Sequence, residues 1–313
     1  MVSFSLAPFE ISAVVYASIF ALMSFGLTLT YLTTKVPNFA HGSFVTVGVY
    51  VAFSLFRING INPYASTPVS FLLGGITAVL MYAGVLRPLA NRGASLVSLM
   101  IATLAVDIAF TGILGIYSDI LFFRFRITDA KSFVPINADF TFLGLNGVFF
   151  IAPLTLGLLT LFINLLFTRT KFGVAMRASV ENPSLARIVG IDVEKVYAVS
   201  WFLAGGLAAL AGNYYSLWLS GGVDVGSEII VAIFAASVLG GLSSIYGAVL
   251  GGIVIGGSEV LLTTLGSLYL GGNAVLPYQK GIPLIIMAIM LLLLPQGLTS
   301  LNRRRLSMLL GRR

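Results

Sequence analysis

Long uninterrupted runs of apolar residues constrain this chain more than any other feature. A helix needs roughly 20 apolar residues to cross the hydrocarbon core of a bilayer, which is about 30 Å thick. Backbone polar groups inside that core must be satisfied within the protein, which a helix does by itself. The clear runs therefore predict an all-α transmembrane bundle, and they are Ile11–Leu32, Val69–Leu86, Leu96–Ile116, Val148–Phe167, Val196–Leu219 and Ile245–Leu268.

Shorter apolar runs occur at Phe44–Phe56, Ile229–Leu242 and Ile282–Leu298. Each is too short to cross comfortably unless polar or glycine-rich neighbours extend it. Broken or re-entrant helices are tolerated at membrane depth where they line a cavity or are buried in protein. We therefore expect one transmembrane domain over residues 1–313, a polytopic bundle of about 8–10 helices with some short or discontinuous.

Composition agrees with a surface that faces lipid. Hydrophobic residues make up 58% of the chain and charged residues only 9%, whereas soluble domains carry about 25% charged residues. There is no cysteine, and His41 is the one histidine. A disulfide framework, a thiolate metal site and an all-histidine metal site are therefore excluded within the chain, and we expect neither a cofactor nor a bound metal.

The net charge of +7 has a distribution that indicates membrane topology and not nucleic-acid binding. Basic residues gather in the segment 169–196 and near the C-terminus, beside apolar runs, as in cytoplasmic loops. No Lys or Arg precedes Lys35, so the first run reads as a retained span and not a cleaved signal. We expect a multi-pass protein of the inner or plasma membrane, with the N-terminus outside and the C-terminus cytoplasmic.

Two hydrophilic segments are longer than simple turns. The segment 117–147 is predicted to be an external loop containing a short hairpin, and 169–196 an internal loop. Neither has room for a nucleotide-binding domain, and the chain lacks the G-x-x-x-x-G-K-[ST] phosphate loop. The chain is therefore not expected to be an enzyme, and any ATP hydrolysis must occur on a separate subunit.

The internal loop contains signals for a short, well-capped helix. Asn182 is a favoured N-cap, Pro183 suits the first helical position, and Gly190 suits the C′ position after a helix over Pro183–Val189. The pattern allows two interpretations, a helix that docks on a partner or an amphipathic helix that lies on lipid headgroups.

Three stretches together resemble a known family. Residues 177–191, with Arg177-Ala178-Ser179-Val180-Glu181-Asn182-Pro183, Ala186 and Val189-Gly190-Ile191, are similar to the coupling loop of ABC importer permeases. The narrower resemblance is to branched-chain amino-acid permeases of the LivH and LivM type. It extends to Asn38-Phe39-Ala40-His41-Gly42 and to the glycine-rich stretch at 238–248. This chain departs from the family pattern at Ser243, where glycine is common, and at Pro183.

The resemblance implies a function and its partners. Such permeases translocate branched-chain or related amino acids by ATP-driven alternating access. They work with two cytoplasmic ABC ATPase subunits, a second permease subunit or second copy, and an extracytoplasmic substrate-binding protein. The resemblance also implies that the internal loop couples to an ATPase through Glu181, Asn182, Pro183, Leu185, Ala186, Arg187, Val189 and Gly190.

Polar residues inside the apolar runs are candidates for the translocation pathway. Asp107 and Glu259 are intramembrane carboxylates, which should face the bundle interior or a wet cavity. Asn38 and His41 lie at the mouth of the second run. Interhelical hydrogen bonding is the competing interpretation for each. An ion-gradient-driven secondary transporter of a small polar solute is the alternative function, with both carboxylates as ion sites, but it leaves the capped loop without a purpose.

Overall fold

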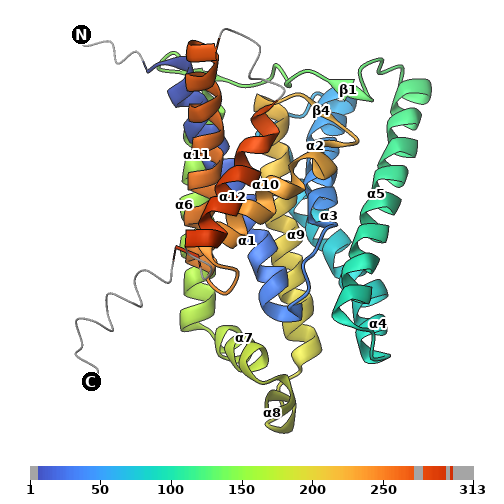
Figure 1. Cartoon of the computed structure of the whole chain (residues 1–313). Coiled ribbons are helices and arrows are strands. Elements are labelled where there is room, and N and C mark those ends of the chain that lie inside the picture. The colour runs from blue at the N-terminus through green and yellow to red at the C-terminus, as the bar shows by residue number, and fades with distance from the viewer. Residues whose placement is uncertain (1–5, 271–277, 294–296, 299–313) are drawn as a thin grey trace.

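The computed structural model describes residues 6–270, 278–293 and 297–298 and shows the predicted polytopic helical bundle (Figure 1). Within those residues, seven helices are long and apolar enough to cross a membrane. They are α1 (Pro8–Thr34), α2 (His41–Asn59), α3 (Pro63–Met81) with its continuation to Asn91, α5 (Leu96–Phe125), α6 (Gly147–Arg169), α9 (Val193–Trp218) and α11 (Ile245–Leu270).

The short apolar runs have different outcomes. The run at Phe44–Phe56 is part of α2, which polar and glycine residues extend to 19 residues. The other two remain short, as α10 (Val225–Gly240) and α12 (Ile282–Leu293). Helix α10 packs against α1, α2, α11 and α12, so it is surrounded by protein, as a membrane-depth helix of 16 residues requires.

The segment predicted to be an external loop begins later than the sequence predicts. Helix α5 continues past Ile116 to Phe125, so the loop starts at Arg126 and not at 117. The extra turns stay helical because the Tyr117 hydroxyl donates to Ser54 Oγ on α2 at 2.9 Å, and Leu121 is fully buried. The predicted hairpin is present as β2 (Thr141–Phe142) and β3 (Leu145–Asn146), while β1 (Ser132–Phe133) pairs with β4 (Gly221–Gly222).

Helix α1 forms the centre of the bundle. It packs against α6, α9, α10 and α11, and every residue from Ala17 to Thr30 is buried. A helix that is apolar all round belongs in such a position. By contrast, α5 stands at the edge of the bundle in Figure 1 and exposes apolar side chains such as Ile108, which is 73% exposed. That surface suits contact with lipid.

Small residues bring the central helix backbones into direct contact. A methyl group added at Gly48 on α2 would overlap the backbone carbonyl of Ala209 on α9, and Gly74 on α3 opposes Gly205 on α9 in the same way. The glycines of α11 behave likewise, since Gly252 lies against Ala21 on α1 and Gly256 against Tyr16. Small residues allow this approach, and in lipid close packing is a main source of helix association.

Substitution of Gly48 by alanine should destabilise the bundle. The added methyl group meets rigid backbone of α9, and overpacking of this kind typically costs about 1–3 kcal/mol. Gly112 on α5 is the matched control, since it is also helical but has no atom within 4 Å of an added methyl group. Thermal unfolding in detergent should show a lower midpoint for Gly48→Ala than for Gly112→Ala. Equal midpoints would contradict the packing account.

Candidate coupling site and translocation residues

Two short helices follow α6 and project beyond the bundle at the end opposite β1 and β4 (Figure 1). Helix α7 (Lys171–Glu181) begins at Thr170, whose hydroxyl accepts the Gly173 N–H at 3.2 Å. Helix α8 (Pro183–Ile188) follows directly and lies at the far tip. Because α8 extends past the ends of the long helices, it is available to a protein partner outside the bundle.

The predicted caps of α8 are confirmed. The Asn182 side-chain oxygen accepts the Leu185 N–H at 3.0 Å, and Pro183 occupies the first helical position. At the other end Gly190 has φ +86°, and the Ile191 N–H donates to the Ala186 carbonyl at 3.0 Å. This is the hydrogen bonding of a Schellman cap, which favours glycine because other residues are strained at positive φ. Both ends of a very short helix are thereby held.

The two faces of α8 differ in what they contact. Ala186 is only 2% exposed and packs within the chain, so its small side chain supports the helix and does not reach a partner. The side chains of Leu185, Ile188 and Val189 are 56%, 81% and 67% exposed. We call these three residues the apolar tip. A contiguous exposed apolar group on a projecting element is typical of an interaction surface.

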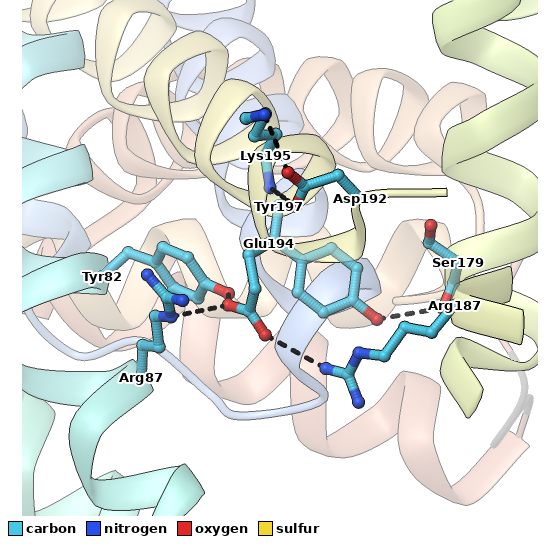
Figure 2. A network of polar contacts seen from close by, with 8 residues as sticks. All are labelled: Tyr82, Arg87, Ser179, Arg187, Asp192, Glu194, Lys195 and Tyr197. Atoms are coloured by element: carbon cyan, nitrogen blue, oxygen red, sulfur yellow. Dashed lines mark hydrogen bonds and ion pairs between the residues drawn. The ribbon is translucent and has the colours of Figure 1, made fainter. Parts of the chain in front are cut away.

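Glu194, in the first turn of α9, joins α8 to the rest of the bundle (Figure 2). One carboxylate oxygen contacts Arg187 of α8 at 3.0 Å. The other contacts Arg87 of α4 (Arg87–Asn91) at 3.0 Å and accepts the Tyr82 hydroxyl at 2.9 Å. Glu194 therefore links α8, seven residues before it, to the end of the α3 extension, which is more than 100 residues away in sequence. We call Glu194 with Tyr82, Arg87 and Arg187 the glutamate junction.

A π-helical turn, η1 (Tyr82–Leu86), helps to form this junction. In it the Arg87 N–H bonds to the Tyr82 carbonyl, five residues earlier. The Tyr82 ring stacks on Trp201 of α9 with ring centroids 5.5 Å apart. Such π-turns are rare within α-helices and occur frequently at functional sites.

Further bonds attach α7 and cap α9. The Tyr197 hydroxyl on α9 donates to the Ser179 carbonyl on α7 at 2.9 Å (Figure 2). The Asp192 carboxylate accepts the backbone N–H of Lys195 at 3.1 Å and pairs with its ammonium at 2.9 Å. The Lys195 contacts hold the pKa of Asp192 below its ordinary value. Glu181, the last residue of α7, is exposed.

Asn38 and His41 are fully buried where α1 passes into α2. The Asn38 side-chain oxygen accepts the Ala40 N–H at 3.1 Å, which shapes the connection. His41 Nε2 is 2.9 Å from the Met23 carbonyl of α1, so this nitrogen donates. Asn38 Nδ2 and His41 Nδ1 have no partner among the described residues. The burial and hydrogen bonds of both residues favour a structural role, in which they hold α1 and α2 together, over a place in the translocation pathway.

The two intramembrane carboxylates lie in different surroundings. Asp107 on α5 accepts the Ser43 hydroxyl of α2 at 2.5 Å and that of Ser227 of α10 at 3.3 Å. It therefore ties the peripheral helix α5 to the bundle. Glu259 on α11 is only 6% exposed and lines a cavity of about 340 Å³ between α1, α9, α10 and α11. Asn38, His41 and Asp107 are not among the residues that line this cavity.

Comparison with known proteins decides the family. Residues 11–294 match the family described as branched-chain amino acid transport system / permease component. The chain is also 46% identical over 299 residues to a Methanocaldococcus jannaschii protein named "Probable branched-chain amino acid transport permease protein LivH", covering 96% of this chain and 94% of that one. This chain belongs to the branched-chain amino-acid transport permease family.

More distant relatives share the same description or a related one. The BraD permease protein of a branched-chain amino acid transport system in Pseudomonas aeruginosa is 26% identical, with 80% of this permease and 83% of BraD covered. A tyrosine transport system permease protein of Clostridioides difficile is 29% identical, with 74% of this permease and 72% of the relative covered. The relatives of this permease are thus described by different amino-acid substrates.

Sequence reasoning missed part of the site of this permease. Glu194, Arg87 and Tyr82 were not singled out, because they are far apart in sequence and each is ordinary in its own context. One local signal was available for Glu194: an acidic residue just after the N-cap Asp192 is favourable in the first turn of a helix. Its partners on α4 and η1 were not accessible to any local pattern.

Glu194→Gln should loosen α8 without unfolding the permease. Glutamine keeps the shape and an acceptor for Tyr82 but removes both ion pairs, which at such exposure contribute about 0.2–1 kcal/mol each. Amide hydrogen exchange in residues 182–191 should become roughly three- to tenfold faster. Lys195→Gln is the control, since Lys195 pairs with Asp192 and not with α8. Unchanged exchange in Glu194→Gln would show that the junction does not hold α8.

Proposed function

We propose that this permease is the membrane-spanning subunit of an ATP-driven importer that carries branched-chain or closely related amino acids. One observation carries the proposal: an apolar tip on a doubly capped helix projects from the bundle and is tied to a central helix through Glu194. The chain has no phosphate-binding loop of its own, so energy must enter from a separate subunit. The names of the relatives support the substrate class.

The partners follow from the same features. We expect two cytoplasmic ABC ATPase subunits, one of which receives α8 through Leu185, Ile188 and Val189. We also expect a second permease subunit or second copy, an extracytoplasmic substrate-binding protein, and the surrounding lipid. In the coupling site, Asn182, Pro183, Ala186 and Gly190 would shape α8, Arg187 would hold it, and Glu181 would lie exposed beside it.

The contacts of α8 support a mechanical route by which a partner could move the spans. Closure of the ATPases would displace α8, and Arg187 would transmit the displacement to Glu194 at the start of α9. Glu194 also holds Arg87 and Tyr82, which continue α3. Helices α9 and α3 touch at Gly205 and Gly74 with no flexible side chain between them. Elements packed so closely move as bodies, as alternating access needs.

Four polar residues are proposed to act at the translocation pathway, and the structure supports one of them more strongly than the other three. Glu259 is supported most strongly, because it is buried and lines a cavity. Asn38, His41 and Asp107 would act by setting how α1, α2 and α5 pack beside the pathway. Family membership does not favour a secondary transporter, and the separate settings of Asp107 and Glu259 do not resemble one shared ion site.

We propose that α8 faces the cytoplasm and that the segment 126–146 faces outward. Basic residues near α8 and acidic residues such as Asp129 and Asp139 in the other segment support this orientation. In intact cells, an impermeant maleimide should label Asn137→Cys and leave Ser184→Cys unlabelled, because both residues are exposed but on opposite sides. The chain has no native cysteine. Labelling at Ser184→Cys alone would reverse the orientation.

Ile188→Asp should detach the ATPases. The substitution puts a charge in the centre of the apolar tip, where docking would bury it without a partner at a cost of several kcal/mol. Leu143→Asp in the β2–β3 turn is the matched control, since Leu143 and Ile188 are both 81% exposed. Co-purified ATPase and leucine uptake should fall at least tenfold for Ile188→Asp only. Normal uptake by Ile188→Asp would mean that α8 does not couple.

A further inference from the structure

The cavity that contains Glu259 lies toward the end of α11 near the α9–α10 connection, away from α8. Under the proposed orientation, this is the outer half of the bundle. Its walls come from α1, α9, α10 and α11, together with Gln279, Lys280 and Pro283 at the start of α12. A volume of about 340 Å³ is in the range of small-molecule sites.

Among the residues that the structure describes, one of the two Glu259 carboxylate oxygens has a hydrogen-bond partner and the other has none. Oε1 accepts the Gln279 side-chain amide at 3.0 Å, whereas Oε2 is buried and has no partner among the described residues. The residue is 94% buried, given its 6% exposure. An unpaired carboxylate oxygen in such a setting is unfavourable, and it would gain from a positively charged hydrogen-bond donor.

The charges around the cavity leave a negative excess. Its ionisable carboxylates and ammonium are Glu228, Glu259 and Lys280, so when all three are ionised two negative charges face one positive charge, and one negative charge remains. Lys280 is already engaged, since its ammonium lies 3.0 Å from the Glu228 carboxylate at the rim. The uncompensated charge therefore falls on Glu259, deeper in the cavity.

The rest of the lining is mainly apolar or aromatic. Phe20 on α1, Leu219 after α9 and Ile229 on α10 contribute hydrocarbon surface. Tyr16 and Tyr215 bring aromatic rings to the same walls. Glu228 is paired with Lys280, so this largely apolar chamber offers one carboxylate oxygen without a partner among the described residues, that of Glu259. Such a chamber matches a ligand with one cationic end and an aliphatic body.

We propose that this cavity binds a primary ammonium group attached to a short aliphatic chain, with Glu259 Oε2 as its counter-ion. The amino end and side chain of an aliphatic amino acid have this chemistry. The inference rests on the proposed function in one respect, because it makes Glu259 a recognition residue for the substrate of the permease. Glu259 would thus select the charge of the ligand, and the apolar walls would accommodate its body.

Reaction of an introduced thiol tests the inference in the folded chain within membranes. Ala232→Cys places a thiol in the wall of this cavity, in a chain without other cysteines. The quantity measured is the charge-preference ratio, which is the rate with a trimethylammonium methanethiosulfonate divided by the rate with its sulfonate analogue. We expect this ratio to be about tenfold larger at Ala232→Cys than at Asn137→Cys on the outer loop. Adding Glu259→Gln to Ala232→Cys should bring the ratio of cationic to anionic reagent rates down to that at Asn137→Cys.

A protection experiment needs no substitution at Glu259. 3-Methylbutylamine should slow the reaction at Ala232→Cys several-fold, whereas 4-methylpentanoate, which has a carboxylate in place of the ammonium, should not. The inference is overturned if the two cysteine positions give equal ratios, if the thiol reacts with neither reagent, or if the amine gives no protection. Persistence of the charge preference after Glu259→Gln in folded protein would also overturn it.

Leucine uptake by the complete complex is measured separately and tests the proposed function. Normal uptake without a charge preference at Ala232→Cys would reject the cavity assignment alone. A charge preference and amine protection without leucine uptake would reject the proposed importer while the cation site stands.

Discussion

Direct contact between helix backbones is the constraint on which the rest of this structure depends. Lipid is as apolar as the helices, so burial of hydrocarbon gives little drive for them to associate, and close packing must do so. Gly48 against Ala209 and Gly74 against Gly205 put α2 and α3 onto α9 with no side chain between them. Contacts of this kind resist deformation, because a backbone cannot rotate away as a side chain does. A force on one helix is therefore passed to the next.

The glutamate junction attaches α8 to these closely packed helices. Helix α8 has only six residues, and an isolated helix of that length does not persist in water. Its two caps and Arg187 keep it formed and attached to α9, which continues into the packed centre. The same carboxylate holds Arg87 and Tyr82, so under the proposed function a displacement of α8 would act on α9 and the α3 extension together. Without this attachment, the apolar tip could bind a partner but would not transmit the partner's motion to the bundle.

Chemically similar residues have different roles in this bundle because their surroundings differ. Asp107 and Glu259 are both intramembrane carboxylates, and no sequence pattern separates them. Asp107 is paired with serine hydroxyls of α2 and α10, which satisfies both of its oxygens. Glu259 keeps one oxygen unpaired beside a cavity. Likewise Ala186, although predicted within the coupling motif, faces its own chain, while Ile188 is the most exposed residue of the tip.

Local physics allowed the sequence by itself to determine several features of this protein. Hydrophobic runs predicted the spans, and Asn182, Pro183 and Gly190 predicted the ends of α8, because these features depend on residues a few positions apart. The length of α5 beyond Ile116 depended instead on contacts with α2, including the Tyr117–Ser54 hydrogen bond. The contacts of Glu194 with Tyr82 and Arg87, and the Glu259 cavity, likewise combine residues that are far apart in the sequence. Only the tertiary structure decided these, because long-range pairing depends on how helices pack and not on any local pattern.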